Sequence, residues 1–176
     1  MLGTLITSKT RIKLLLKFFL NANNTGYLKS LESEFEDSSN GIRLELNKFE
    51  AASLLISENK GNKKIFKANT KHPMFNDLHN IVMKYTGLDQ VIDAVVENLG
   101  NVYQVYLLGS FARGVESKII DILIVGDLNK DYLYTLVEKA GAMVGKKVRV
   151  LLYTKDEFAE AQPEILAEEH LLIWGA

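Results

Sequence analysis

The sequence predicts an α+β protein, with a mainly helical first half and a second half that forms a small α/β unit with a mixed sheet. Apolar residues recur at helical spacing through the first fifty residues, and two strand-like runs then flank a turn at residues 59–62. From residue 102 onward, strand-like and helix-like segments alternate, which is typical of a small sheet covered by helices. We therefore expect three parts, at residues 1–71, 72–87 and 88–176.

Composition excludes several classes of protein. Of the 176 residues, 47% are hydrophobic and 24% are charged, and only two are proline, so we expect an ordered globular chain. Cysteine is absent, which removes disulfides and thiolate sites and fits a reducing cytoplasm. Three scattered histidines (His72, His79 and His170) predict no metal site. The apolar run at 14–20 is interrupted by Lys17 and is too short to span a membrane.

Charge is unevenly distributed along the chain. Residues 1–86 contain 13 Lys and Arg against 8 Asp and Glu, a balance of +5. The remaining residues contain 8 against 14, a balance of −6. This division suggests two modules with different partners, although solvated surfaces can also produce it by chance.

Three helices are expected before the hairpin. The first has an apolar face of Ile12, Leu15, Leu16 and Phe19, and the second runs from about residue 27 to 35. Ser38 or Ser39 can cap the third helix, in which the apolar positions are Ile42, Leu46 and Phe49. Its opposite face carries the polar residues Asn40, Arg43 and Asn47, with Leu44 among them and Lys48 at the edge.

This order, with "LELNKFEAASLL" leading into a basic hairpin, resembles the winged helix-turn-helix regulators of the arsenic-repressor type over residues 8 to 70. The resemblance implies that the third helix enters the major groove of double-stranded DNA, where Arg suits guanine and Asn suits adenine. Hairpin lysines would then neutralise phosphates or enter the minor groove. The expected DNA-binding residues are Ser39, Asn40, Arg43, Asn47, Lys48, Lys60, Lys63 and Lys64.

Other interpretations of these residues stay open. Arg43 can pair with Glu50 or another acid, and the lysines can simply solubilise a loop. Glu45 and Glu50 reduce the positive potential of the third helix. Winged helices also serve as protein-binding modules.

Two amphipathic helices are expected between the hairpin and residue 100. The first opens near Pro73, with a stripe of Phe75, Leu78, Val82 and Tyr85, and we expect it to form a homodimer interface or to pack within the chain. The second carries Leu88, Ile92, Val95 and Leu99 and is expected to end at Gly100.

The second half predicts strands at 102–108, 119–125 and 148–153. A helix is expected from Asp131 to Met143, with Tyr132, Leu136 and Val137 inward, and another is capped by Thr154. With "GSFARG" between the first two strands, residues 88–160 resemble the minimal nucleotidyltransferases of the polymerase-beta-like superfamily. The tail from Pro163 is expected to pack on the sheet or on a partner subunit.

The resemblance implies a phosphate-binding turn at Gly109 and Ser110, and a family carboxylate at Asp121. The family uses three acids to hold two Mg²⁺ ions, two of them at i and i+2 on one strand. Here Ile119 occupies the first position, and Arg149 is the expected match for the third acid. We therefore expect no catalytic residue and no cofactor; Asp121 and Mg²⁺ would serve only if the domain were active.

The remaining groups suggest a nucleotide or other anion site made of Gly109, Ser110, Arg113, Asp121 and Arg149. Alternatively, the turn is kept for folding, with Ser110 capping its helix and Arg113 paired with Glu116 or Asp121.

These observations favour a cytoplasmic, dimeric, DNA-binding transcriptional regulator with an inactive nucleotidyltransferase-like domain for ligand sensing or assembly. The alternative is a minimal nucleotidyltransferase that modifies a protein or a small molecule. A third possibility is a protein-binding module, such as a toxin-neutralising partner.

Overall fold

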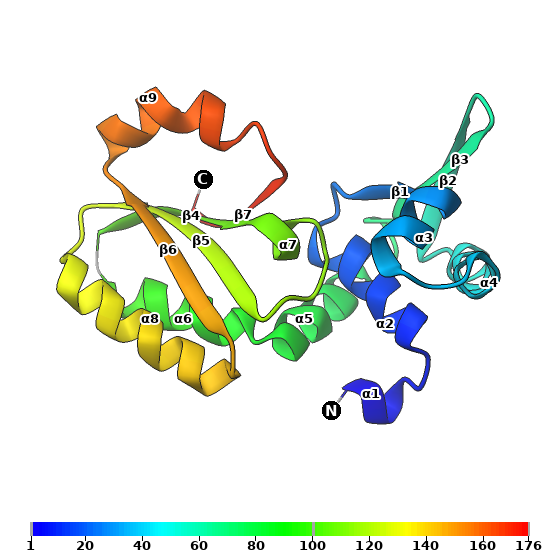
Figure 1. Ribbon diagram of the computed structural model, residues 1–176, viewed down its shortest axis with the longest axis horizontal. Helices are drawn as coiled ribbons and strands as arrows, with labels where there is room; N and C mark the ends of the chain where they lie inside the picture. Colours follow the sequence, from blue (N-terminus) through cyan, green and yellow to red (C-terminus); the bar gives the residue numbers. More distant parts are fainter. Residues whose placement is uncertain (1, 100, 176) are drawn as a thin grey trace. The chain divides into compact units, whose positions relative to one another are not determined.

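The computed structural model describes residues 2–99 and 101–175 (Figure 1). The chain divides into two compact units, Met1–Tyr85 and Thr86–Ala176. No helix among the described residues has the length and apolar character needed to cross a membrane.

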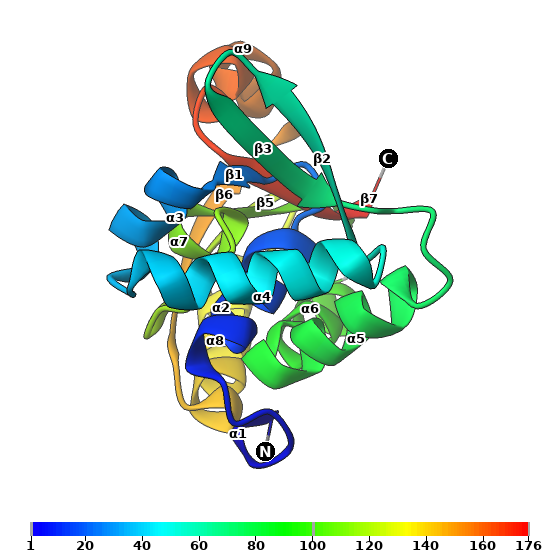
Figure 2. The ribbon, with the colours of Figure 1, turned by 90° about the vertical axis from the view of Figure 1, so that its right-hand side faces the viewer.

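The first unit combines helices with a small antiparallel sheet whose strand order is β1-β3-β2. Its elements are α1 (Leu2–Leu5), α2 (Lys9–Leu15), the π-helical turn η1 (Leu16–Leu20), β1 (Thr25–Tyr27), α3 (Leu28–Phe35), α4 (Ser39–Ala51), β2 (Leu55–Lys60), β3 (Lys63–Ala68) and α5 (Phe75–Thr86). Figure 2 shows α4 in front, with the β2–β3 hairpin extending above it. The three helices and the hairpin that the sequence predicts are confirmed, whereas β1 and the π-helical turn were not expected.

The core of this unit is built from the predicted apolar faces. Phe19, Ile42 and Leu46 are at most 1% exposed, and Ser38 caps α4 by accepting a hydrogen bond from the Gly41 N–H at 3.3 Å. The η1 turn also buries Lys17, whose Nζ lies 2.8 Å from Glu34 Oε1. An ammonium group can be buried here because a carboxylate partner accompanies it.

The α5 helix starts later than expected. Pro73 lies in the turn before it, and the helix begins at Phe75. Val82 is buried, whereas Phe75, Leu78 and Tyr85 are half-buried. On the same helix Ile81 remains 44% exposed.

The second unit is a four-stranded mixed sheet of order β6-β5-β4-β7. It contains α6 (Leu88–Leu99), β4 (Val102–Leu108), α7 (Gly109–Ala112), β5 (Ile119–Gly126), α8 (Lys130–Val144), β6 (Lys147–Tyr153), α9 (Lys155–Ile165) and β7 (His170–Gly175). Strands β5 and β6 are parallel, and β4 is antiparallel to both β5 and β7. The predicted mixed sheet is confirmed.

Helices cover the two faces of this sheet differently. Within the second unit, α6 and α8 lie on one face and α9 lies over the other (Figure 1). Ile120, Ile122 and Ile124 are buried on alternate positions of β5, while Leu123 and Val125 pack with Tyr106 and Phe158 on the α9 side. Asp121 shares the α9 side, because side chains alternate along a strand.

One expectation for this unit is wrong. Tyr132 is 48% exposed, because Asn129 caps α8 and the helical spacing then buries Leu133, Leu136, Val137 and Ala140. The tail lies on the sheet, one of the two placements expected for it: Pro163 is inside α9, and the chain end forms β7 against β4. The predicted helix end at Gly100 lies outside the described residues.

Candidate functional site

One face of α4 presents polar side chains to solvent. Asn40, Arg43 and Asn47 are exposed there, and over residues 2–99 and 101–175 their side chains have no hydrogen bond or ion pair. Leu44, on the same side, is 52% exposed. Of the other residues expected on this helix, Ser39 is half-buried and Lys48 bonds to Glu45 at 3.1 Å. This face of α4 is therefore free to contact a partner.

The acids of α4 are balanced by nearby cations. Glu45 is buried and accepts hydrogen bonds from Arg11 Nε at 2.7 Å and Nη2 at 3.1 Å. The hydrogen bond from Arg11 is the main cause that holds the pKa of Glu45 below its ordinary value. Glu50 bonds to Lys64 and Ser57, so the suggested pairing of Arg43 with Glu50 is wrong. Neither acid adds an uncompensated negative charge beside Arg43.

The three hairpin lysines differ in their surroundings. Lys60 Nζ lies 3.0 Å from Glu58, and Lys64 Nζ lies 2.7 Å from Glu50. Lys63 forms no ion pair within the described part of the chain, and its Nζ lies 4.5 Å from the ring centre of Tyr27. Lys60 and Lys64 would therefore have to leave their ion pairs with Glu58 and Glu50 before they could contact a DNA phosphate.

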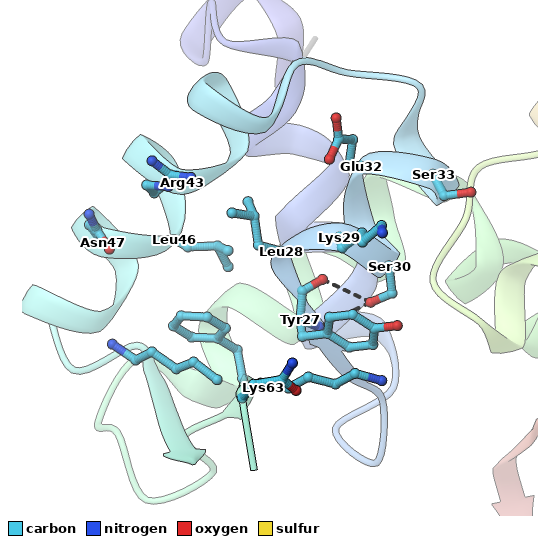
Figure 3. Close-up of a pocket in the computed structure, with 13 residues that line it drawn as sticks. Tyr27, Leu28, Lys29, Ser30, Glu32, Ser33, Arg43, Leu46, Asn47 and Lys63 are labelled. Carbon is cyan, nitrogen blue, oxygen red and sulfur yellow. Dashed lines mark hydrogen bonds between the residues drawn. The ribbon is translucent and has the colours of Figure 1, made fainter. Parts of the chain in front are cut away.

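A groove of about 1090 Å³ separates α4 from the hairpin and α3. Arg43 and Asn47 line it from α4, Lys63 from β3, and Tyr27 and Lys29 from the facing segment (Figure 3). Neither Tyr27 nor Lys29 was predicted as a site residue. Tyr27 ends a strand of three residues, which carries too little alternation to be recognised. The groove brings four basic side chains, Lys29, Arg43, Lys63 and Lys64, together with the acidic Glu32 and several neutral hydrogen-bonding side chains.

In the second unit, the turn between β4 and α7 depends on Gly109. Its φ is +62°, in the left-handed region that favours glycine. A Cβ atom at this position would lie 3.0 Å from Asp121 Oδ2. Gly109 thus allows Asp121, which pairs with Leu108 across β4 and β5, to lie directly against the turn.

Ser110 and Arg113 interact with each other. Arg113 Nη2 lies 3.4 Å from Ser110 Oγ, and Arg113 has no ion pair in the residues the structure describes. The proposed pairing of Arg113 with Glu116 or Asp121 is therefore wrong, and so is the proposed capping role of Ser110, because α7 follows Leu108 and has no side-chain cap. Ser110 and Arg113 instead form a polar pair at the turn.

Asp121 is paired with Arg149. The two residues are Cα partners on the parallel strands β5 and β6, and Arg149 Nε lies 2.5 Å from Asp121 Oδ1. The side chains are 25% and 58% exposed, respectively. The hydrogen bond to Asp121 raises the pKa of Arg149 above its ordinary value. The guanidinium therefore stays charged and occupies one carboxylate oxygen.

These residues do not fit a pair of divalent cations. Ile119 shares a strand face with Asp121 and offers no oxygen, and the strand β6 contains no acid. Among the residues described, no three His, Asp or Glu side chains lie together as metal ligands. Mg²⁺ binds oxygen donors in strict octahedral geometry, and one carboxylate already paired with Arg149 cannot organise two such ions.

The family comparison concerns this second unit. Residues 88–173, just under half of the chain, match the family model described as "Nucleotidyltransferase domain". These residues form a nucleotidyltransferase-like domain. The match agrees with the mixed sheet and with the turn at Gly109. No curated protein matches the chain.

Several solved structures resemble parts of the chain at low TM-scores. One is a tri-AMPylated Shewanella oneidensis HEPN toxin in complex with MNT antitoxin, with 18% identity over 53% of this chain and 74% of that chain and a TM-score of 0.40. Another is a toxin–antitoxin with AMP-PNP, with 18% identity, 50% and 73% coverage and a TM-score of 0.41. Reduced HlyU from Vibrio cholerae matches at 13% identity, 48% and 83% coverage and a TM-score of 0.38. With TM-scores this low, none of them bears on what this chain does.

Proposed function

We propose that this chain is a DNA-binding regulator in which the first unit contacts double-stranded DNA and the nucleotidyltransferase-like domain does not transfer nucleotides. The observation that carries the proposal is the exposed face of α4, where Asn40, Arg43 and Asn47 have no partner among the described residues. Side chains that can read base edges are present there, and the chain itself does not use them.

The arrangement of the first unit supports this proposal. Helix, strand, helix, helix and hairpin follow one another from α2 to β3, with β1 paired to β3, and this is the order of a winged helix-turn-helix. In such modules the helix before the hairpin is the recognition helix and its N-terminal residues reach the bases. Asn40, Arg43 and Asn47 lie in the first three turns of α4.

The chemistry of the side chains sets what each would do. Arg43 can donate two hydrogen bonds to the O6 and N7 atoms of a guanine, and an Asn can pair with adenine. Lys63 would contact a phosphate, which adds salt-dependent affinity without sequence information. The charge balance of +5 in the first unit favours a polyanionic partner.

Substitution of Arg43 tests the proposal. DNA fragments are first selected from genomic DNA by the full-length protein at a stated salt concentration, and the affinity of Arg43→Ala for the selected sequence is then measured. We expect a loss of about 1–3 kcal/mol, with relaxed specificity at one base pair. Lys139→Ala, which removes an exposed positive charge from α8, should bind as the wild type does.

Failure to select any sequence, or equal affinities for wild type and a folded Arg43→Ala variant, would contradict the proposal. Equal loss in Arg43→Ala and Lys139→Ala would also contradict it, because the effect would then reflect total charge alone.

A homodimer through α5 is part of the proposal. A two-fold DNA site needs a two-fold protein, and Met74 and Ile81 are 53% and 44% exposed at or next to this helix. A monomeric mass in solution at the concentration that binds DNA would count against it.

The second unit is proposed to sense an anionic ligand or to assist assembly. Ser110, Arg113 and Arg149 supply a hydroxyl and two guanidinium groups at or near the Gly109 turn. Calorimetric titration with nucleoside phosphates would reveal a ligand, and absence of heat would leave assembly as the role.

The alternative, a minimal nucleotidyltransferase, is the function that the comparisons favour over a DNA-binding regulator. The match to a nucleotidyltransferase domain covers residues 88–173, in the second unit. Against this stands the pairing of Asp121 with Arg149, together with Ile119 in the neighbouring position. Label transferred from a nucleoside triphosphate, and lost in Asp121→Ala, would decide for the enzyme.

A protein-binding module remains a third candidate, because an exposed helix face can also bind a protein. Loss of DNA binding in a folded Arg43→Ala variant would count against it.

A further inference from the structure

The Asp121–Arg149 pair lies at the position where the family would hold its metal ions, on neighbouring strands of the sheet. The two Cα atoms are direct register partners, and neighbouring strands lie about 4.8 Å apart. The side chains therefore meet without any change in the backbone, and the contact at 2.5 Å follows from the register.

The surroundings of Asp121 are cationic and apolar. Ile119 lies two residues before it on the same strand face, and the register partner of Ile119 is Lys147. Asp121 thus has a hydrocarbon side chain beside it along β5 and two basic residues on β6.

A divalent cation at Asp121 would find too few oxygen ligands and would be repelled by the positive charge of Arg149. One oxygen of Asp121 bonds to Arg149, and the other lies close to Gly109. A cation entering this position would have to displace a guanidinium whose charge is already balanced by the carboxylate.

We propose that Arg149 replaces the divalent cations as the permanent counter-charge of Asp121, so that the site excludes Mg²⁺ and Mn²⁺. The fold keeps its carboxylate and its turn without needing a metal. This inference rests on the proposed loss of nucleotidyl transfer, but it does not depend on DNA binding.

Two substitutions would rebuild a metal site. Ile119→Asp places a second carboxylate at i and i+2 with Asp121, and Arg149→Asp places a third on the adjacent strand. The three acids would share one face of the sheet, which is the arrangement that can bind hard cations through oxygen.

A titration of the full-length protein with Mn²⁺ tests the inference. Binding is measured as the loss of the electron paramagnetic resonance signal of free Mn²⁺. We expect no Mn²⁺ binding at Asp121 in the wild type. The Mn²⁺ titration curves of the wild type and of Asp121→Ala should therefore be the same. The double variant Ile119→Asp/Arg149→Asp should bind Mn²⁺ at least about tenfold more tightly than the wild type does. Adding Asp121→Ala to the double variant should remove the gain.

Mn²⁺ binding by the wild type that is lost in Asp121→Ala would overturn the inference, and so would a folded double variant without any gain. If circular dichroism finds the double variant unfolded, Arg149→Asp alone is the decisive variant, because residue 149 is exposed and Ile119 stays in place. A gain in Mn²⁺ affinity over the wild type in Arg149→Asp, even if it is less than tenfold, supports the inference. No gain in Mn²⁺ affinity overturns it. Failed DNA selection would contradict the proposed function without altering these titrations.

Discussion

At the scale of single residues, Gly109 and Asp121 constrain each other. The turn bends through a positive φ, and the carboxylate lies where any side chain on residue 109 would begin. Arg149 then fixes the carboxylate from the neighbouring strand. The geometry around the turn is therefore retained even though the neighbouring acid is missing.

Gly109→Ala should destabilise the second unit by about 1–3 kcal/mol, because it combines backbone strain with a close contact to Asp121. The measurement is urea unfolding of the full-length protein, followed by a signal from the second unit such as Trp174 fluorescence. Gly145→Ala is the matched control, since Gly145 has a φ of +65° but nothing within 4 Å of its added Cβ.

The difference between the two variants measures the contact with Asp121. We expect Gly109→Ala to be the less stable of the two, and Asp121→Ala to recover part of the loss. Equal stabilities of Gly109→Ala and Gly145→Ala would mean that the left-handed backbone alone, and not the contact with Asp121, requires glycine at position 109.

At the scale of secondary-structure elements, the regular amphipathic segments could be predicted and the short ones could not. The α4 helix carries both a serine cap and a clear apolar stripe, and the hairpin carries a Gly61–Asn62 turn. In contrast, β1 is only three residues long, and β7 gains its strand pairing from β4, far away in the sequence. Such pairing depends on tertiary contacts that local patterns do not contain.

In the candidate sites, too, features set by local sequence patterns could be predicted, and features set by tertiary contacts could not. The exposed residues of α4 were predictable from 100° spacing. Strand alignment placed Arg149 beside Asp121, but their ion pair was not predicted. The partners of Lys60 and Lys64 could not be predicted, because long flexible side chains choose among several acids only in the folded chain. Tyr27 depended on the unrecognised β1 strand, whereas Lys29 lies in the predicted helix α3 and was not singled out there.

Lys63 gives the element-scale prediction. Because it has no acidic partner in the described part of the first unit, Lys63→Ala should weaken DNA binding about equally for all sequences and lower the salt slope by about one. Lys60→Ala should do less, because Lys60 is already paired with Glu58 and would have to leave that ion pair to contact a phosphate. The measurement is affinity against salt concentration for selected and unrelated DNA.

A sequence-dependent loss in Lys63→Ala would contradict a phosphate contact. An unchanged salt slope in that variant would place the hairpin away from the DNA.

At the scale of the whole molecule, the chain joins a basic unit to an acidic one. The charges of +5 and −6 fall on either side of the division between the two compact units. The basic unit has free hydrogen-bonding groups on α4, whereas the acidic unit keeps a nucleotidyltransferase-like sheet whose retained carboxylate is neutralised by Arg149. The function we propose, recognition without metal chemistry, rests on this combination.

A crystal structure grown with a nucleoside triphosphate and Mg²⁺ tests that claim most directly. We expect Arg149 Nε to remain bonded to Asp121, with no ion coordinated by that carboxylate. Density for two Mg²⁺ ions bridging Asp121 and another acidic residue would contradict it.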